Sequence, residues 1–152
     1  MTQLTANFTL EEFEHSDVAV RHGIPNTIPK SLLPAISATA EMMQRIRDFL
    51  GQPIIVSSGY RSEAVNRAVG GAGLSDHLTA RACDFRCPGF GDPVLVALAL
   101  APHVSTLGIG QLIAEFGRAG WVHVSTRVPD NPANRIITID RQGTRVGVHD
   151  AR

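Results

Sequence analysis

Short apolar runs separated by glycine-containing turns fill the last third of the sequence. They span residues 108–116, 120–128 and 135–148. Runs of this length and spacing are typical of β-hairpins, in which two strands are joined by a tight turn. We therefore expect two hairpins in this part of the chain. The two strands of a hairpin pair antiparallel, so we expect an antiparallel sheet here.

Helix signals lie earlier in the chain. Thr9 is followed three residues later by Glu12, which is the pattern of a capping box at the start of a short helix. Residues 31–50 carry apolar side chains at helical spacing and are followed by a glycine that suits a helix end. Asp92 and Pro93 suit the N-cap and first position of a helix over 93–101, which is apolar nearly all round, so we expect this helix to be buried.

The order of these segments indicates the fold class. Residues 53–59 and 80–85 have the composition of strands, and Ser62 is a suitable cap for a brief helix between them. Helices followed by a hairpin-rich second half favour an α+β fold, with N-terminal helices packed on a small antiparallel sheet. The 152 residues are enough for one ordinary core, so we expect a single domain, 1–152.

Charge and composition argue against several kinds of partner. The 14 Lys and Arg residues balance the 14 Asp and Glu residues, so no overall field favours nucleic acid or an anionic membrane. No apolar run approaches the roughly 18 residues of a membrane span, and the start lacks the features of a signal peptide. We expect a monomer that is synthesised in the cytoplasm without a signal peptide. Cys83 and Cys87 are too few for a disulfide framework, which favours buried thiols over a pair or a metal site.

Two histidines and one aspartate form a candidate metal site. His77 follows a double glycine, Asp84 lies on a predicted strand, and His123 lies in the alternating run "WVHVS". Two imidazoles and one carboxylate are typical of catalytic zinc, whose open position holds a water that becomes a nucleophile near neutral pH. A lone strand histidine is more often a structural residue, so residue types and spacing alone leave both interpretations open.

Several ordered motifs resemble one enzyme family. They are "SSGYRS", "NRAVGG", "SDHLTARACDF" and "WVHVS", and with the N-terminal stretch they extend over residues 7–126. Together they resemble the zinc D-Ala-D-Ala carboxypeptidases and their relatives that cleave L-Ala-D-Glu bonds or D-Ala dipeptides in bacterial cell walls. The N-terminal stretch is similar to the same region of family members from phages.

The resemblance implies roles for particular residues. It implies that His77, Asp84 and His123 bind Zn²⁺, that Arg61 contacts the substrate, and that Ser75 is a lesser substrate-binding residue. The planar guanidinium of an arginine suits a peptide carboxylate because it can donate two parallel hydrogen bonds.

The chain departs from the family pattern at two positions. Ala80 stands where the family usually has glycine, and alanine is strained there if the position requires a positive φ. Gly120 stands where many members carry an acidic general base. The phage-type sequences have a glutamate in a stretch like "QLIAE", and this points to Glu115 as the catalytic residue.

Strand geometry sets a condition on Glu115. Its side chain shares a face with His123 only if the intervening turn holds an odd number of residues or contains a bulge. A regular four-residue loop 117–120 would place the two side chains on opposite faces. Strand register slips readily by one residue, so the alternative that Glu115 is only a solvated strand carboxylate stays open.

The sequence thus predicts a zinc-dependent peptidase that hydrolyses stem or cross-link peptides of bacterial peptidoglycan. We expect a phage or prophage origin, and action at the cell wall after release or as a virion component. One alternative is a catalytically silent wall-binding or virion module that keeps zinc for stability, since metal binding contributes to folding in either case. Another is a small D,D-dipeptidase.

Overall fold

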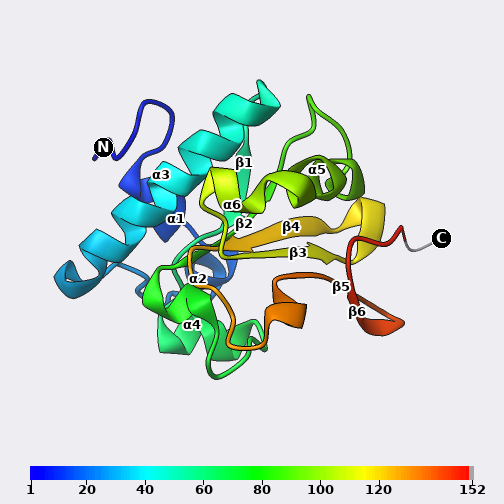
Figure 1. Ribbon diagram of the computed structural model, residues 1–152. Helices are drawn as coiled ribbons and strands as arrows, with labels where there is room; N and C mark the ends of the chain where they lie inside the picture. Colours follow the sequence, from blue (N-terminus) through cyan, green and yellow to red (C-terminus); the bar gives the residue numbers. More distant parts are fainter. Residues whose placement is uncertain (151–152) are drawn as a thin grey trace.

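A six-stranded mixed sheet forms the centre of the computed structural model, which describes residues 1–150 (Figure 1). In spatial order the strands are β1 (Ile55–Ser58), β2 (Ala82–Arg86), β4 (Trp121–Ser125), β3 (Gln111–Glu115), β5 (Ile136–Asp140) and β6 (Gly143–Val146). The two predicted hairpins are β3–β4 and β5–β6. Strands β1 and β2 extend the sheet on the other side of β4.

The prediction of a wholly antiparallel sheet is wrong for one pair of strands. β5 runs parallel to β3, whereas every other neighbouring pair is antiparallel. The connection 126–135 causes this, because it carries the chain from the end of β4 past β3 to the free edge of β3. β5 therefore starts where β4 ends, and it has the same direction as β3.

The helices are α1 (Leu10–Glu14), α2 (Asp17–His22), α3 (Leu33–Leu50), α4 (Glu63–Ala68), α5 (Pro93–Leu100) and α6 (Val104–Leu107). The capping box of Thr9 and Glu12 is present at the start of α1, as predicted. Ser62 caps α4 through the N–H of Val65. α3 begins two residues later than predicted, because residues 30–32 form a 3-10 turn, and it ends at a glycine with φ 68°. None of the helices within residues 1–150 is both long and apolar enough to cross a membrane.

The core lies on one face of the sheet. Side chains of β2, β3 and β4 that alternate onto this face are fully buried, and α3 and α5 pack against them (Figure 1). A buried hydrogen bond from Thr39 Oγ1 to the carbonyl of Ala80, 2.8 Å long, ties α3 to the loop before β2. Because strand side chains alternate, Asp84 and His123 are left on the opposite face.

α5 is less buried than its sequence predicts. Leu95 is 51% exposed and Leu98 is 50% exposed, so only one side of the helix faces the core. A helix that is apolar all round carries no information about which side will be covered, and here no described element packs over the outer side. The prediction of a buried helix is therefore confirmed for the side that faces the core and wrong for the outer side.

Both cysteines are buried free thiols in the part of the chain that the structure describes. Burial raises the pKa of Cys83 and of Cys87, which disfavours the reactive thiolate. The prediction of buried thiols is confirmed.

The β3–β4 turn depends on Gly120. A Cβ atom at this position would lie 1.7 Å from the carbonyl oxygen of Glu115, so the turn has no room for a side chain. We expect Gly120→Ala to lower the free energy of unfolding by about 1–3 kcal/mol, which is typical of overpacking. Urea denaturation measures this change. Gly73→Ala is the matched control, because its Cβ would meet no atom within 4 Å, and equal stability of the two variants would contradict the expectation.

Candidate metal centre

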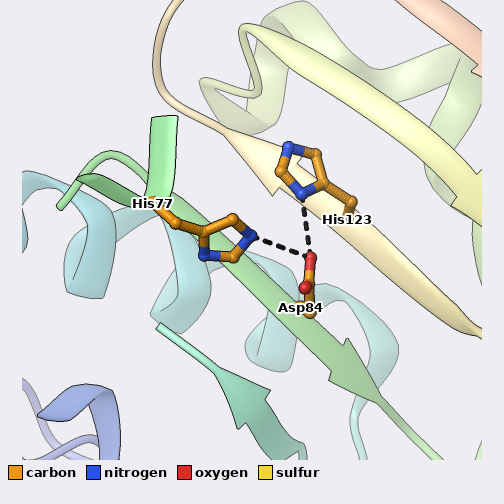
Figure 2. A group of neighbouring side chains, drawn as sticks. All are labelled: His77, Asp84 and His123. Atoms are coloured by element: carbon orange, nitrogen blue, oxygen red, sulfur yellow. Dashed lines mark hydrogen bonds and ion pairs between the residues drawn. The ribbon is translucent and has the colours of Figure 1, made fainter. Parts of the chain in front are cut away.

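Three side chains converge on the face of the sheet opposite the core. His77 lies in the 3-10 turn η2 (Asp76–Thr79), Asp84 in β2 and His123 in β4, and one ligand atom from each lies within 4.8 Å of the others. Asp84 and His123 are direct partners across the β2–β4 ladder, so the sheet register brings them together. The turn before β2 adds His77, and both imidazoles point toward the carboxylate (Figure 2).

The hydrogen bonds of His77 leave one ring nitrogen suited to a metal. Its Nδ1 lies 2.6 Å from the carbonyl oxygen of Gly59, which can only accept, so Nδ1 carries the hydrogen. Nε2 of the neutral ring then presents a lone pair to Oδ1 of Asp84, 3.3 Å away. Two acceptors that face each other need a proton or a cation between them. This arrangement fits a metal ion bound through Nε2.

The third ligand is oriented by the same carboxylate. Nδ1 of His123 lies 2.8 Å from Oδ1 of Asp84. Burial disfavours the charged form of Asp84. When the imidazoles are protonated, the charge of His77 and the hydrogen bonds from His123 and His77 outweigh burial and hold the pKa of Asp84 well below its ordinary value. Burial also disfavours charged His123, yet its hydrogen bond to Asp84 and the charge of Asp84 raise its pKa above 6.5. The site thus offers a charged carboxylate at neutral pH and an imidazole whose proton competes with a metal ion.

The donor set matches catalytic zinc. Two nitrogen ligands and one oxygen ligand leave a position open for water or substrate, whereas structural zinc is enclosed by four protein ligands. Within residues 1–150 this is the one group of His, Cys, Asp and Glu side chains with such geometry. His77, Asp84 and His123 can therefore hold a zinc ion, and their role as its ligands stays a prediction.

We expect zinc affinity to fall as the pH falls through the pKa of His123. Because this pKa is raised above 6.5, protonation begins to compete with zinc near neutral pH. The loss approaches roughly tenfold per pH unit for each bound proton that zinc displaces. Asp84 adds no loss in this range, since its lowered pKa keeps it charged. Chelator competition between about pH 8 and about pH 5 measures the affinity, and a constant value would count against histidine ligands.

Arg61 lies beside the metal centre. Its Nη2 donates to Oδ2 of Asp84 at 3.3 Å, its Nε donates to Ser58 at 3.0 Å, and its Nη1 donates to Asn66 at 3.2 Å. The guanidinium is held on several sides, and its side chain is 16% exposed. These bonds use three of the five N–H groups of an arginine, so donors remain for a ligand. The predicted contact with substrate stays a prediction.

Ser75 and Ala80 frame the turn that carries His77. The hydroxyl of Ser75 accepts a hydrogen bond of 3.2 Å from the backbone N–H of His77, so Ser75 caps this turn. Its predicted role toward substrate stays a prediction. Ala80 ends the turn with φ 60° and ψ 26°, in the left-handed region. The position therefore requires a positive φ, as the glycine of the family pattern indicates. Ala80 adopts this φ at some cost in backbone strain, because its Cβ disfavours the left-handed region.

Glu115 lies on the same face of the sheet as His123. The five residues 116–120 separate the paired Glu115 and Trp121, and Ile113 pairs with His123. The turn is therefore odd in length, which meets the condition set by strand alternation. Burial and the charge of Asp84 raise the pKa of Glu115, against the opposing charges of His123 and Arg61. The carboxylate of Glu115 thus interacts electrostatically with the metal ligands Asp84 and His123.

Gly120 is excluded as a site for the acid found there in many relatives. A side chain at Gly120 would overlap the backbone of Glu115, as the 1.7 Å approach of a Cβ shows. The backbone of this turn therefore requires any acidic residue on this side of the site to come from another position.

Sequence reasoning missed several polar residues around the ligands. Asp76 is bonded to Ser125 and Arg127, which lie 49 and 51 residues further along the chain. Asn66 supports Arg61 and also donates to the carbonyl of Ala72 at 2.9 Å. No local motif links Asp76 to partners so far along the chain, and only the packing of the loop before β2 against the end of β4 brings them together.

Comparison with known families agrees with this geometry. A model of the family Peptidase M15 matches residues 6–125, a segment that contains all three ligands, Arg61 and Glu115. No curated protein matches the chain. M15 peptidases depend on zinc, and the His-Asp-His cluster is able to bind it. The chain belongs to the Peptidase M15 family of zinc metallopeptidases.

Proposed function

We propose that the protein hydrolyses peptide bonds in the stem or cross-link peptides of bacterial peptidoglycan. The observation that carries the proposal is the convergence of the three ligands with Glu115 and Arg61 on one side of the sheet. This arrangement combines a metal site with a proton acceptor and a cation that can hold a carboxylate. Stem peptides of peptidoglycan carry such carboxylates.

The residues of the site divide the chemical work between them. Zinc, when bound, acts as a Lewis acid and lowers the pKa of water. Glu115 accepts a proton from the attacking water and passes it to the leaving amine, a role helped by its raised pKa. Arg61 orients the substrate through a carboxylate or the scissile carbonyl, using the N–H groups that its protein bonds leave over. His77, Asp84 and His123 hold the metal.

Digestion of purified peptidoglycan tests the proposal directly. We expect the zinc-loaded protein to release peptides with new amino and carboxyl termini, which mass spectrometry identifies. The termini also tell a D,D-carboxypeptidase from an L-Ala-D-Glu endopeptidase, and parallel assays with free D-Ala-D-Ala detect a small D,D-dipeptidase. A zinc-loaded protein that leaves both substrates intact would refute the proposal.

The competing function is a catalytically silent zinc module that binds the wall or the virion. The glycine at position 120 favours it, because many relatives carry their acid there. Glu115 on the face of His123 weakens that argument, since an acid is available from the neighbouring strand. A silent module would bind peptidoglycan in a sedimentation assay without changing it.

The biological setting is part of the same proposal. We propose a phage or prophage origin and action at the cell wall, either after release from the cell or from the virion. Immunoblots of purified particles and of lysate fractions would tell these two routes apart.

Replacing Arg61 by lysine tests the substrate contact. Lysine keeps a positive charge near Asp84 but loses the planar fork of donors. We expect Arg61→Lys to lower kcat/KM by about 10- to 100-fold, the effect of losing one hydrogen bond to a charged group. Zinc content should not change. Arg67→Lys on the exposed side of α4 is the control, and near-normal activity of Arg61→Lys would assign Arg61 to structure alone.

A further inference from the structure

Asp76 joins the two segments that carry the histidine ligands. Its Oδ2 accepts a hydrogen bond of 2.9 Å from the hydroxyl of Ser125, and its Oδ1 accepts one of 2.7 Å from Nε of Arg127. The hydroxyl of Ser125 also accepts a hydrogen bond of 3.1 Å from the backbone N–H of Arg127. Asp76 and Ser125 are both buried. We call these three residues the Asp76 brace.

We propose that the Asp76 brace is a positioning device that fixes His77 relative to His123. Asp76 directly precedes His77 in η2, and Ser125 follows His123 by two residues on the same face of β4. The hydrogen bond between Asp76 and Ser125 therefore joins positions that lie one residue and two residues from the histidine ligands. A shift between η2 and β4 would change the separation of the two imidazoles, whose ring centroids are 5.2 Å apart.

The backbone alone leaves this separation less well defined. The backbone around η2 is bonded from Arg61 N to His77 O at 3.1 Å and from Arg81 N to Asp76 O at 3.0 Å. From there, a bond from Thr126 N to Arg81 O, 3.0 Å long, and the β2–β4 pairing that starts at Ala82 and Ser125 lead to the end of β4. The side chain of Asp76 adds a direct and buried connection across the same gap. Because zinc accepts only a narrow range of ligand positions, such a connection contributes to affinity.

The bonding of Asp76 also argues against other roles. Both carboxylate oxygens are engaged, one by a hydroxyl and one by a guanidinium. A general base needs an oxygen that faces the reacting water. Asp76 therefore acts through His77 and Ser125. The inference concerns zinc binding and does not depend on which peptide bond is cut.

Ser125→Ala removes one arm of the brace without changing any charge. We expect zinc affinity to fall by about tenfold, the lower end of the range for residues that support metal ligands. Chelator competition measures the affinity, and the visible spectrum of the Co²⁺-substituted protein reports the ligand geometry. We expect the spectrum to change as well. If Ser125 had a purely structural role, Ser125→Ala would lower the stability of the metal-free protein and would leave the zinc affinity and the Co²⁺ spectrum unchanged.

Thr138→Val provides the matched control. Thr138 is also a buried hydroxyl of the sheet, and it donates to the carbonyl of Gly147 at 2.8 Å, away from the metal ligands. We expect this variant to lose stability while it keeps the zinc affinity and the Co²⁺ spectrum of the parent. Equal zinc affinity of Ser125→Ala and the parent would overturn the proposal.

Arg127→Ala removes the other arm of the brace, the hydrogen bond from Arg127 to Asp76. It provides the test of the proposal if Ser125→Ala does not fold. The Arg127 side chain is 40% exposed, so its removal leaves the core intact. We expect a loss of zinc affinity of a few fold, and a combined loss in Ser125→Ala/Arg127→Ala that differs from the sum of the single effects, since both act through Asp76. Strict additivity, or no loss for Arg127→Ala, would contradict a shared brace.

Discussion

His123→Ala is expected to remove tightly bound zinc from the protein and to abolish its metal-dependent activity. The variant leaves one imidazole and one carboxylate, and two protein ligands do not make a catalytic zinc site. It also removes the hydrogen bond of 2.8 Å that orients Asp84. We expect metal analysis after dialysis to give about one zinc per chain for the parent and almost none for the variant.

The control must separate loss of a ligand from loss of the fold. His22→Ala replaces an exposed histidine at the end of α2, far in sequence from the ligands, and should keep its zinc. Circular dichroism of His123→Ala should show an intact sheet, since its neighbours Val122 and Val124 still fill the core. Zinc retained at one per chain in a folded His123→Ala would remove His123 from the ligand set.

Much of this site follows from local patterns in the sequence. Alternation in "WVHVS" puts Val122 and Val124 into the core and leaves His123 on the other face, as the structure has it. The same alternation places Asp84 on the face away from the core, because its neighbours Cys83 and Phe85 are buried on the core side of β2. Glycine and capping residues then mark where the helices and turns begin and end. These features depend on neighbours within a few residues, so the sequence predicts them.

Features that depend on distant partners were not predicted. The parallel pairing of β5 with β3 depends on the path of the connection 126–135, which has no strand or helix periodicity. The exposed side of α5 depends on which elements lie over it. The partners of Asp76 are determined by the register of β4 against the loop before β2. In each case the information lies in the packing of the whole chain.

For Glu115, the number of residues in the β3–β4 turn decides whether its side chain lies on the face of the metal ligands. Strand alternation predicts only that Glu115 shares a face with Ile113, and the length of the next turn decides whether this is also the face of His123. Phe116 adopts φ 59° and the turn holds five residues, so the pairing of Glu115 with Trp121 puts the acid on the side of the metal ligands. The alternative of a carboxylate on the opposite face is wrong.

The role of Glu115 as general base leads to the second large effect. We expect Glu115→Gln to lower turnover by at least about a hundredfold, the lower bound for losing a positioned acid or base. Glutamine has nearly the same shape but cannot accept the proton of the attacking water. The fold should be retained, because Glu115 is only partly buried and its strand partners are unchanged. Zinc content should also be retained, since Glu115 is outside the ligand cluster.

Single-turnover kinetics on wall peptides measures the effect, with Glu41→Gln on the exposed side of α3 as the control for replacing a carboxylate by an amide. The pH profile adds a second test. Burial and the charge of Asp84 raise the pKa of Glu115. With zinc kept saturating at every pH, the acidic limb of activity in the parent should therefore lie above pH 4.5, and Glu115→Gln should lose that limb. A Glu115→Gln variant that hydrolyses the peptides within a few fold of the parent would make Glu115 a solvated strand residue, and the proton acceptor would have to be sought elsewhere in the site.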